Sequence, residues 1–139
     1  LFSLRTHLEG LMTTDDSQEL MQLTHRLPDS IATADWETYA DLCDETLTAY
    51  EPEARGHRVA GMPFHRFYFD AGPGKGGVQN LVVDPHIRLM SDCAVVTYVR
   101  LVQRANEQGF VSDRFEETRV WQRQNGRWQH VHFHRSSNL

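Results

Sequence analysis

The sequence has 139 residues, of which 40% are hydrophobic and 24% are charged, as expected for one soluble globular domain with its own core. Nineteen Asp and Glu outnumber fourteen Lys and Arg, which argues against a nucleic-acid partner because phosphate binding needs a basic face. No stretch is apolar enough for a membrane span or a signal peptide, so we expect a cytoplasmic protein with no membrane contact.

The N-terminal part of the chain is expected to be helical. Leucines at positions 1, 4, 8 and 11 indicate either a weak amphipathic helix or a linker, in a chain that we expect to be a piece of a longer protein. From Asp15, spacing of three to four residues predicts a long helix with a stripe of Leu20, Leu23, Leu27 and Ile31. Pro28 removes a backbone hydrogen bond within this stripe, so we expect a kink near residues 24–27 or two abutting helices.

Shorter elements follow the long helix. Asp35 is the expected N-cap of a second helix, and residues 46–50 are β-branched and aromatic enough for a strand, with a shorter strand at 58–59. Residues 62–63 open a third helix, because proline is preorganised for a first helical turn. The glycine-rich stretch 72–77 predicts a mobile loop and lacks the Gly-Lys-Ser/Thr ending of a phosphate loop.

Strand patterns dominate the rest of the chain. They cover residues 78–83, 87–90 and 94–103, and then a hairpin over residues 115–135. Helices first and antiparallel strands after them predict an α+β fold, with the long N-terminal helix packed in a curved antiparallel sheet.

The hairpin is expected to turn at residues 125–126, because Asn-Gly between two strand patterns is a strong signal for a tight antiparallel turn. A two-residue loop pairs Gln124 with Arg127. A type I turn followed by a glycine bulge pairs Arg123 with Arg127 instead, and this slip moves every side chain of one strand to the other face.

The two registers place the hairpin arginines differently. The two-residue loop puts Arg119 and Arg135 on opposite faces, whereas the glycine bulge puts both on the more apolar face. Because burial favours the bulge, we predict that both arginines point toward the core. That register also turns Phe115, Trp121, Val131 and Phe133 inward and Glu116, Thr118, Gln122, His130, His132 and His134 outward.

A third arginine comes from the neighbouring strand, where Tyr98 and Arg100 share one face of the alternating run 94–102. Buried arginines keep their charge, so three converging ones need answering carboxylates. Two interpretations stay open. Either Glu116 or Glu117 forms buried ion pairs with them, or they line a cavity for a carboxylate-bearing ligand or an acidic peptide side chain.

Other candidate sites are weaker. Histidines at 130, 132 and 134 alternate on one strand, and because the outer two stand roughly 13 Å apart, the three cannot share a metal ion. No carboxylate or cysteine motif completes a two-histidine site, so we expect no metal. Cys43 and Cys93 are predicted to be buried free thiols, and His65 is either a pocket acid or base or a core histidine.

Several stretches resemble the association (hub) domain of calcium/calmodulin-dependent protein kinase type II. They are FHRFYF at 64–69, DPHIRLM at 84–90, EETRVW at 116–121, NGRW at 125–128 and VHFHR at 131–135, with DWETYADLCD at 35–44 and AYEPEARG at 49–56 extending the likeness. The resemblance assigns residues 15–137 to a hub domain and leaves residues 1–14 as an N-terminal extension or linker.

This resemblance implies a cone-shaped fold of the nuclear-transport-factor-2-like superfamily. It also implies assembly into two stacked rings, a dodecamer or tetradecamer, that gathers kinase or regulatory segments of calmodulin-binding kinases. The implied pocket accepts small carboxylates and needs no cofactor. Its residues are Arg100, Arg119, Arg135, Tyr98 and, at the mouth, His65.

Kinase motifs are missing from the sequence, so we expect a hub that is not itself catalytic and has no catalytic residues. The alternative is a small enzyme of the same cone fold. It would be an isomerase or dehydratase acting on a carboxylate-bearing substrate, with His65 or Glu117 as its acid or base.

Overall fold

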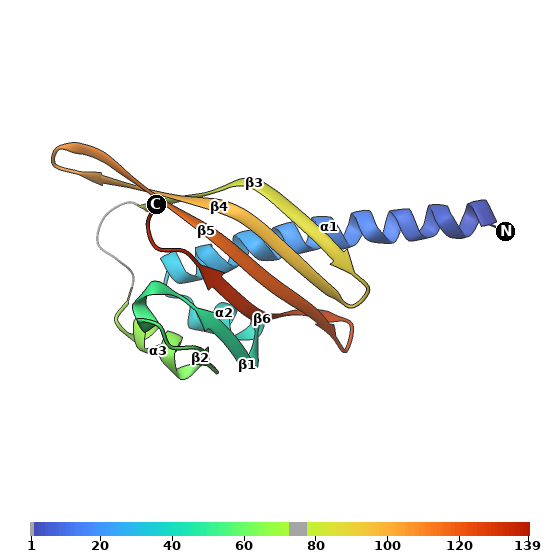
Figure 1. The fold of residues 1–139 in the computed structure, drawn as a ribbon, viewed down its shortest axis with the longest axis horizontal. Coiled ribbons are helices and arrows are strands. Elements are labelled where there is room, and N and C mark those ends of the chain that lie inside the picture. Colours follow the sequence, from blue (N-terminus) through green and yellow to red (C-terminus); the bar gives the residue numbers. More distant parts are fainter. Residues whose placement is uncertain (1, 73–77) are drawn as a thin grey trace.

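A computed structural model describes residues 2–72 and 78–139, with side chains from Asp15 onward (Figure 1). The elements are α1 (Phe2–Ala32), α2 (Trp36–Leu42), β1 (Cys43–Tyr50), a 3-10 turn (Pro52–Ala54), β2 (Val59–Ala60), α3 (Pro63–Asp70), β3 (Val78–Met90), β4 (Cys93–Asn106), β5 (Gly109–Gln124) and β6 (Arg127–Arg135). The predicted α+β class is confirmed. Apart from Gly72, the predicted glycine-rich loop lies outside the described residues.

α1 is one continuous helix that contains Pro28, so the predicted long helix is confirmed and the alternative of two abutting helices is wrong. The backbone of residues 2–14 belongs to the same helix, in agreement with the helical alternative for this stretch. Leu20 and Leu27 are fully buried before the proline. Their core contacts stabilise the helix where the backbone hydrogen bond from residue 28 is missing.

Six strands form one curved sheet in the order β2-β1-β6-β5-β4-β3, in which β1 and β6 are parallel and the other neighbours are antiparallel. We call the face that packs against α1 the inner face and the opposite one the outer face (Figure 1). The inner face carries the buried core, including Ala94, Val96 and Trp121. Leu81, Val83 and Met90 alternate with inward residues of β3 and are exposed on the outer face.

Two strand predictions need correction. The strands expected at residues 78–83 and 87–90 are a single strand, β3, whose register shifts between Val83 and His86 where Asp84 has a φ of 53°. β5 begins at Gly109, earlier than the predicted residue 115, because it pairs with β4 along its whole length. In residues 109–114 the two apolar residues, Phe110 and Val111, are adjacent, so this part of the hairpin lacks the apolar alternation that predicts a strand.

The small helices form as expected. The Asp35 carboxylate accepts a hydrogen bond from the Thr38 backbone N–H at 3.2 Å, which caps α2, and a proline opens α3. Phe69 at the end of α3 packs against Trp36 and Tyr39 of α2, with ring centroids 5.2 and 4.8 Å apart. These aromatic contacts join the two helices into one wall.

The β5–β6 hairpin turns on Asn125 and Gly126, whose φ values are 53° and 79°, and Gln124 pairs with Arg127. The predicted glycine bulge is therefore wrong, and the two-residue alternative describes the turn. Two consecutive left-handed residues form a type I′ turn, whose twist matches that of the flanking strands.

A bulge does exist, but it lies further along β6. Trp121 pairs with His130, whereas Val120 pairs with His132, so Val131 is an extra residue between two registers. The inserted residue changes the parity of the strand, and residues on either side of it that would alternate instead face the same way.

The bulge at Val131 decides which side chains reach the inner face. Beyond it Arg119 pairs with Phe133, and the prediction that Arg119 and Arg135 share the core side is confirmed. Two other assignments are wrong: His130 is fully buried instead of facing outward, and Val131 is only partly buried.

Candidate functional site

A cavity of about 710 Å³ is bounded by the end of α1, by α3 and by the inner face of β4, β5 and β6. Its walls are mostly apolar and include Tyr39, Phe115 and Phe133. The volume falls within the roughly 300–1,000 Å³ typical of small-molecule sites. The predicted pocket residues that line it are His65, Arg100, Arg119 and Arg135.

Arg119 projects from the middle of β5 and is 2% exposed. Its Nε donates to the Tyr98 hydroxyl at 2.7 Å, its Nη2 donates to Glu117 Oε1 at 3.5 Å, and its guanidinium carbon lies 4.0 Å from the Phe133 ring centroid. Burial opposes the charge, but Tyr98 and Glu117 outweigh burial and raise the pKa of Arg119. Arg119 therefore remains a cation in the protein interior.

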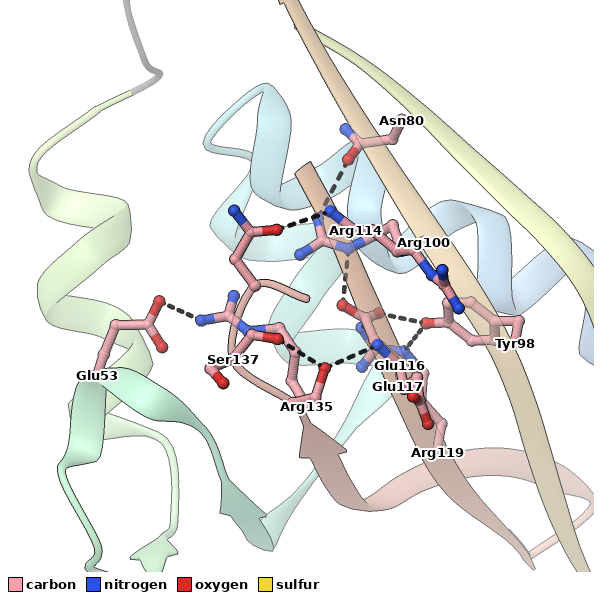
Figure 2. Close-up of polar contacts among 12 residues, drawn as sticks. Glu53, Asn80, Tyr98, Arg100, Arg114, Glu116, Glu117, Arg119, Arg135 and Ser137 are labelled. Atoms are coloured by element: carbon pink, nitrogen blue, oxygen red, sulfur yellow. Dashed lines mark hydrogen bonds and ion pairs between the residues drawn. The ribbon is translucent and has the colours of Figure 1, made fainter. Parts of the chain in front are cut away.

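Glu117 forms ion pairs with Arg119, which is buried, and with Arg100, which is partly buried. Arg100 Nε donates to Glu117 Oε2 at 2.7 Å, and the Glu117 side chain is fully buried. Arg100 Nη1 also donates to Asn80 Oδ1 at 3.1 Å (Figure 2). The sequence offered Glu116 or Glu117 as the partner of the arginines. Glu117 forms the ion pairs, and Glu116 is exposed.

Tyr98 lies behind the cavity wall and is 4% exposed. Its hydroxyl donates to Glu117 Oε1 at 2.7 Å and accepts from Arg119 (Figure 2). Burial raises the pKa of Tyr98 to about 12, so the hydroxyl keeps its proton at neutral pH. Tyr98 thus fixes the positions of Glu117 and Arg119 relative to each other.

Arg135 joins the cluster from the end of β6 (Figure 2). It forms an ion pair with Glu53, and its guanidinium carbon lies 5.1 Å from the Phe115 ring centroid. Its Nε is buried and has no hydrogen-bond partner among the described residues. One donor of this guanidinium is therefore unused within the described part of the chain.

His65 on α3 contributes a different chemistry to the cavity wall. Its Nε2 lies 3.1 Å from Glu51 Oε2, and the two side chains are 11% and 9% exposed. An ionised carboxylate only accepts hydrogen bonds, so Nε2 carries the proton and Nδ1 is the basic nitrogen of the neutral ring. Within the described residues, Nδ1 has no partner.

The charges of the cluster do not cancel. Arg100 and Arg119 share a single carboxylate, that of Glu117, while Arg135 has Glu53. Arg100 and Arg119 together therefore carry one positive charge more than the carboxylate that they share, whereas the Glu51 carboxylate on the cavity wall lies against His65. An anion beside Arg100 and Arg119 would pair with this local charge.

Sequence reasoning missed Glu51, Glu53 and Asn80. The two glutamates flank Pro52 in a polar stretch, and no local pattern shows that this stretch folds against the arginines. Asn80 was within reach of a parity argument, because it lies two residues before the inward Val82 in β3 and therefore shares its face.

The described residues contain no group of three His, Cys, Asp or Glu side chains placed to hold a metal ion. Cys43 and Cys93 are free thiols, and burial raises the pKa of Cys43 to about 12. Among the helices of the described chain, none is long and apolar enough to cross a membrane.

Sequence comparisons identify relatives of the chain. The family model of the calcium/calmodulin dependent protein kinase II association domain matches residues 16–138. The subunit delta of calcium/calmodulin-dependent protein kinase type II from Oryctolagus cuniculus is 43% identical over 140 residues, which cover 98% of this chain. The matched region is 26% of that kinase subunit, so the chain spans about a quarter of this relative's length.

Solved structures agree with the sequence match. The association domain of C. elegans CaMKII superimposes with a TM-score of 0.83 at 40% identity, covering 89% of this chain and 97% of that one. The hub homology domain from Chlamydamonas reinhardtii gives 0.80 at 43% identity, covering 87% and 97%. An NTF2-like protein from Cytophaga hutchinsonii, 19% identical with a TM-score of 0.70 over 87% of this chain and 97% of its own, shows the same fold alone. The expected nuclear-transport-factor-2-like fold is confirmed.

Proposed function

This chain belongs to the calcium/calmodulin-dependent protein kinase II association-domain family, and from that premise we propose that it assembles copies of itself into two stacked rings, a dodecamer or tetradecamer. The family match over residues 16–138 carries the proposal, because an association domain is an oligomerisation module. The matched kinase subunit is about four times as long as the matched region. We therefore propose that the ring gathers kinase or regulatory segments.

The outer face of the sheet supports self-association. Leu81, Val83 and Met90 are 38%, 40% and 47% exposed on this face. Leu81 and Val83 lie two residues apart on this face of β3, and adjoining apolar side chains on an exposed face are typical of protein interaction sites. A second copy that covers them would remove this area from water and so contribute to the free energy of assembly.

Light scattering and native mass spectrometry test the assembly. At micromolar concentration we expect a particle with twelve or fourteen times the 16.1 kDa mass of the chain. A monomer at that concentration would contradict the proposal.

The cavity is proposed to bind a small carboxylate or an acidic peptide side chain. The uncompensated charge shared by Arg100 and Arg119 supports this function, because guanidinium groups match carboxylates in a bidentate fashion. One surplus charge suits one carboxylate, and the rings of Phe115 and Phe133 suit an apolar body attached to it. We therefore expect a monocarboxylate such as phenylacetate to bind more tightly than the dicarboxylate malonate.

Thermal shift and calorimetry test this ligand class. Phenylacetate is expected to raise the melting temperature of the wild type and to leave that of Arg119→Ala unchanged. Arg114→Ala is the matched control, because Arg114 lies on the same strand but is exposed. Equal stabilisation of wild type and Arg119→Ala would remove the arginines from the binding site.

One observation favours the enzyme alternative, namely the basic Nδ1 of His65 at the cavity wall with Glu51 behind it. The other candidate base, Glu117, has both carboxylate oxygens occupied by Tyr98, Arg100 and Arg119. Turnover of a hydroxy or keto carboxylate that is lost in His65→Ala would establish the enzyme. Ring assembly without such turnover would leave the hub function alone.

A further inference from the structure

The bulge in β6 brings an additional imidazole to the back of the cavity. His130 is fully buried on the inner face, directly before the extra residue Val131. Among the described residues it is not part of the cavity lining, but it contacts Arg119, which is. The proposed function assigns it no role.

His130 is held between a cation and a thiol. Arg119 Nη1 lies 3.3 Å from His130 Nε2, and Cys43 Sγ lies 3.5 Å from His130 Nδ1. A guanidinium has no acceptor, so Nε2 must accept this hydrogen bond, and the proton of the neutral ring is on Nδ1, facing the sulfur. The Trp121 ring, with its centroid 5.1 Å away, packs against the imidazole and restricts its rotation.

This contact completes the support of Arg119. Tyr98 binds Nε, Glu117 binds Nη2 and His130 binds Nη1, so each nitrogen of the guanidinium has a partner. Of the five N–H donors of an arginine, two remain for a ligand. Their direction is fixed only while all three partners hold the guanidinium plane.

We propose that His130 is a positioning residue for Arg119: the neutral ring is the acceptor that orients the guanidinium for anion binding, and protonation of the ring abolishes that orientation. The inference rests on the proposed anion-binding function of the cavity.

The surroundings of His130 disfavour its protonation but cannot hold a protonated ring in place. Burial and then Arg119 lower the pKa of His130 well below its ordinary value. The titratable or charged groups around it are Arg119 on β5, Cys43 on β1 with Tyr39 of α2 beyond it, His65 on α3 and His132 on β6. A protonated ring has two donors and no acceptor, so it would present an N–H to the N–H of Arg119.

Calorimetric titration with ethanesulfonate tests the inference, because this monoanion stays ionised throughout the pH range in which histidine titrates. His130→Leu is expected to weaken binding about tenfold at neutral pH. His130→Gln supplies an amide oxygen for Arg119 and an NH₂ group for Cys43, so it should retain most of the affinity. His132→Gln, on the same strand but partly exposed, is the control.

The pH profile separates positioning from a general loss of stability. On acidification the affinity of the wild type should fall more steeply than that of His130→Gln, in which residue 130 does not titrate. An affinity that rises in the wild type alone would show that the added positive charge matters more than orientation, and it would overturn the inference.

Nitrogen-15 NMR supplies a readout that needs no ligand and no leucine variant. We expect the Nδ1–H tautomer of His130 and slowly exchanging Arg119 Nη protons; the Nε2–H tautomer would overturn the inference. Equal ethanesulfonate binding by wild type and His130→Leu would overturn it while leaving the anion-binding function intact. A wild type that binds no anion would overturn both.

Discussion

On each face of the sheet some side chains invert the distribution expected of an isolated soluble domain, although the inner face also carries the apolar core. The inner face buries Arg119 and Glu117 at 2% exposure each, whereas the outer face exposes apolar side chains such as Val83. Polar groups normally face water and large apolar groups normally face the core. The inversion suits a subunit whose inner face binds an anion and whose outer face binds another copy, which is the function proposed above.

The largest expected effect comes from breaking the inner face. Glu117→Leu leaves Arg100 and Arg119 without their carboxylate, and an uncompensated buried charge costs about 3–5 kcal/mol of the free energy of unfolding. Urea unfolding measures the loss. Glu116→Leu, one residue away and exposed, should change stability by less than about 0.5 kcal/mol. Equal losses of the free energy of unfolding in both variants would mean that removing a carboxylate from the inner face costs no more than removing one from the outer face.

The corresponding change on the outer face should weaken assembly without changing the stability of the subunit. Val83→Asp places a charge within the exposed apolar group and should weaken contacts between copies by at least about 2 kcal/mol each. Sedimentation velocity should then show smaller particles with an unchanged melting of the subunit. Gln79→Asp, on the same strand and face but at a polar position, is the control. An intact ring in Val83→Asp would place the interface elsewhere.

Lowering the pH should destabilise the inner face by a smaller amount, through the buried His130. The folded state lowers the pKa of His130 through burial and Arg119, so below the ordinary pKa of about 6.5 the unfolded chain binds the additional proton. Stability must then fall as the pH falls, by about 1.4 kcal/mol between about pH 7.5 and about pH 5.5. His130→Gln should lose that part of the slope, which urea unfolding at the two pH values measures. An unchanged slope would indicate that His130 is not buried as a neutral ring.

The smallest effect is expected at the turn that sets the initial register of the β5–β6 hairpin. Gly126 has a φ of 79°, and an added Cβ meets no atom within 4 Å, so Gly126→Ala is strained only in its backbone. We expect a cost of about 1 kcal/mol in thermal unfolding. Asn125→Gly, which relaxes the other left-handed residue, should cost less. A neutral Gly126→Ala would argue against the type I′ turn.

Periodicity in the sequence predicted the class of fold, the long helix and the sharing of one face by Arg119 and Arg135. That last prediction was right although its reason was wrong. A one-residue bulge anywhere between the turn and Phe133 produces the same parity beyond it, so alternation reports that a bulge exists and not where it lies. Gly126 was a plausible position by local turn chemistry, but the observed position is Val131.

The partners of the arginines could be predicted only in part. Glu117 was one of two candidates because it lies on the same strand, within reach of a parity argument. Glu51 and Glu53 come from a segment whose position depends on tertiary packing, and local spacing carries no information about it. His130 was predicted to face outward because the bulge was placed at Gly126 and unbroken alternation was assumed along β6. The extra residue is instead Val131, directly after His130.

The insertion of Val131 changes the side of the sheet that every later residue of β6 faces, although the identity of those residues stays the same. The character of the cavity therefore depends on the length of β6 as well as on its composition. Deleting Val131 would exchange the inward and outward sets from residue 132 on, replacing Phe133 and Arg135 by histidines. Single-residue insertions and deletions are thus a route by which a sheet of this kind can acquire or discard a binding site in one step.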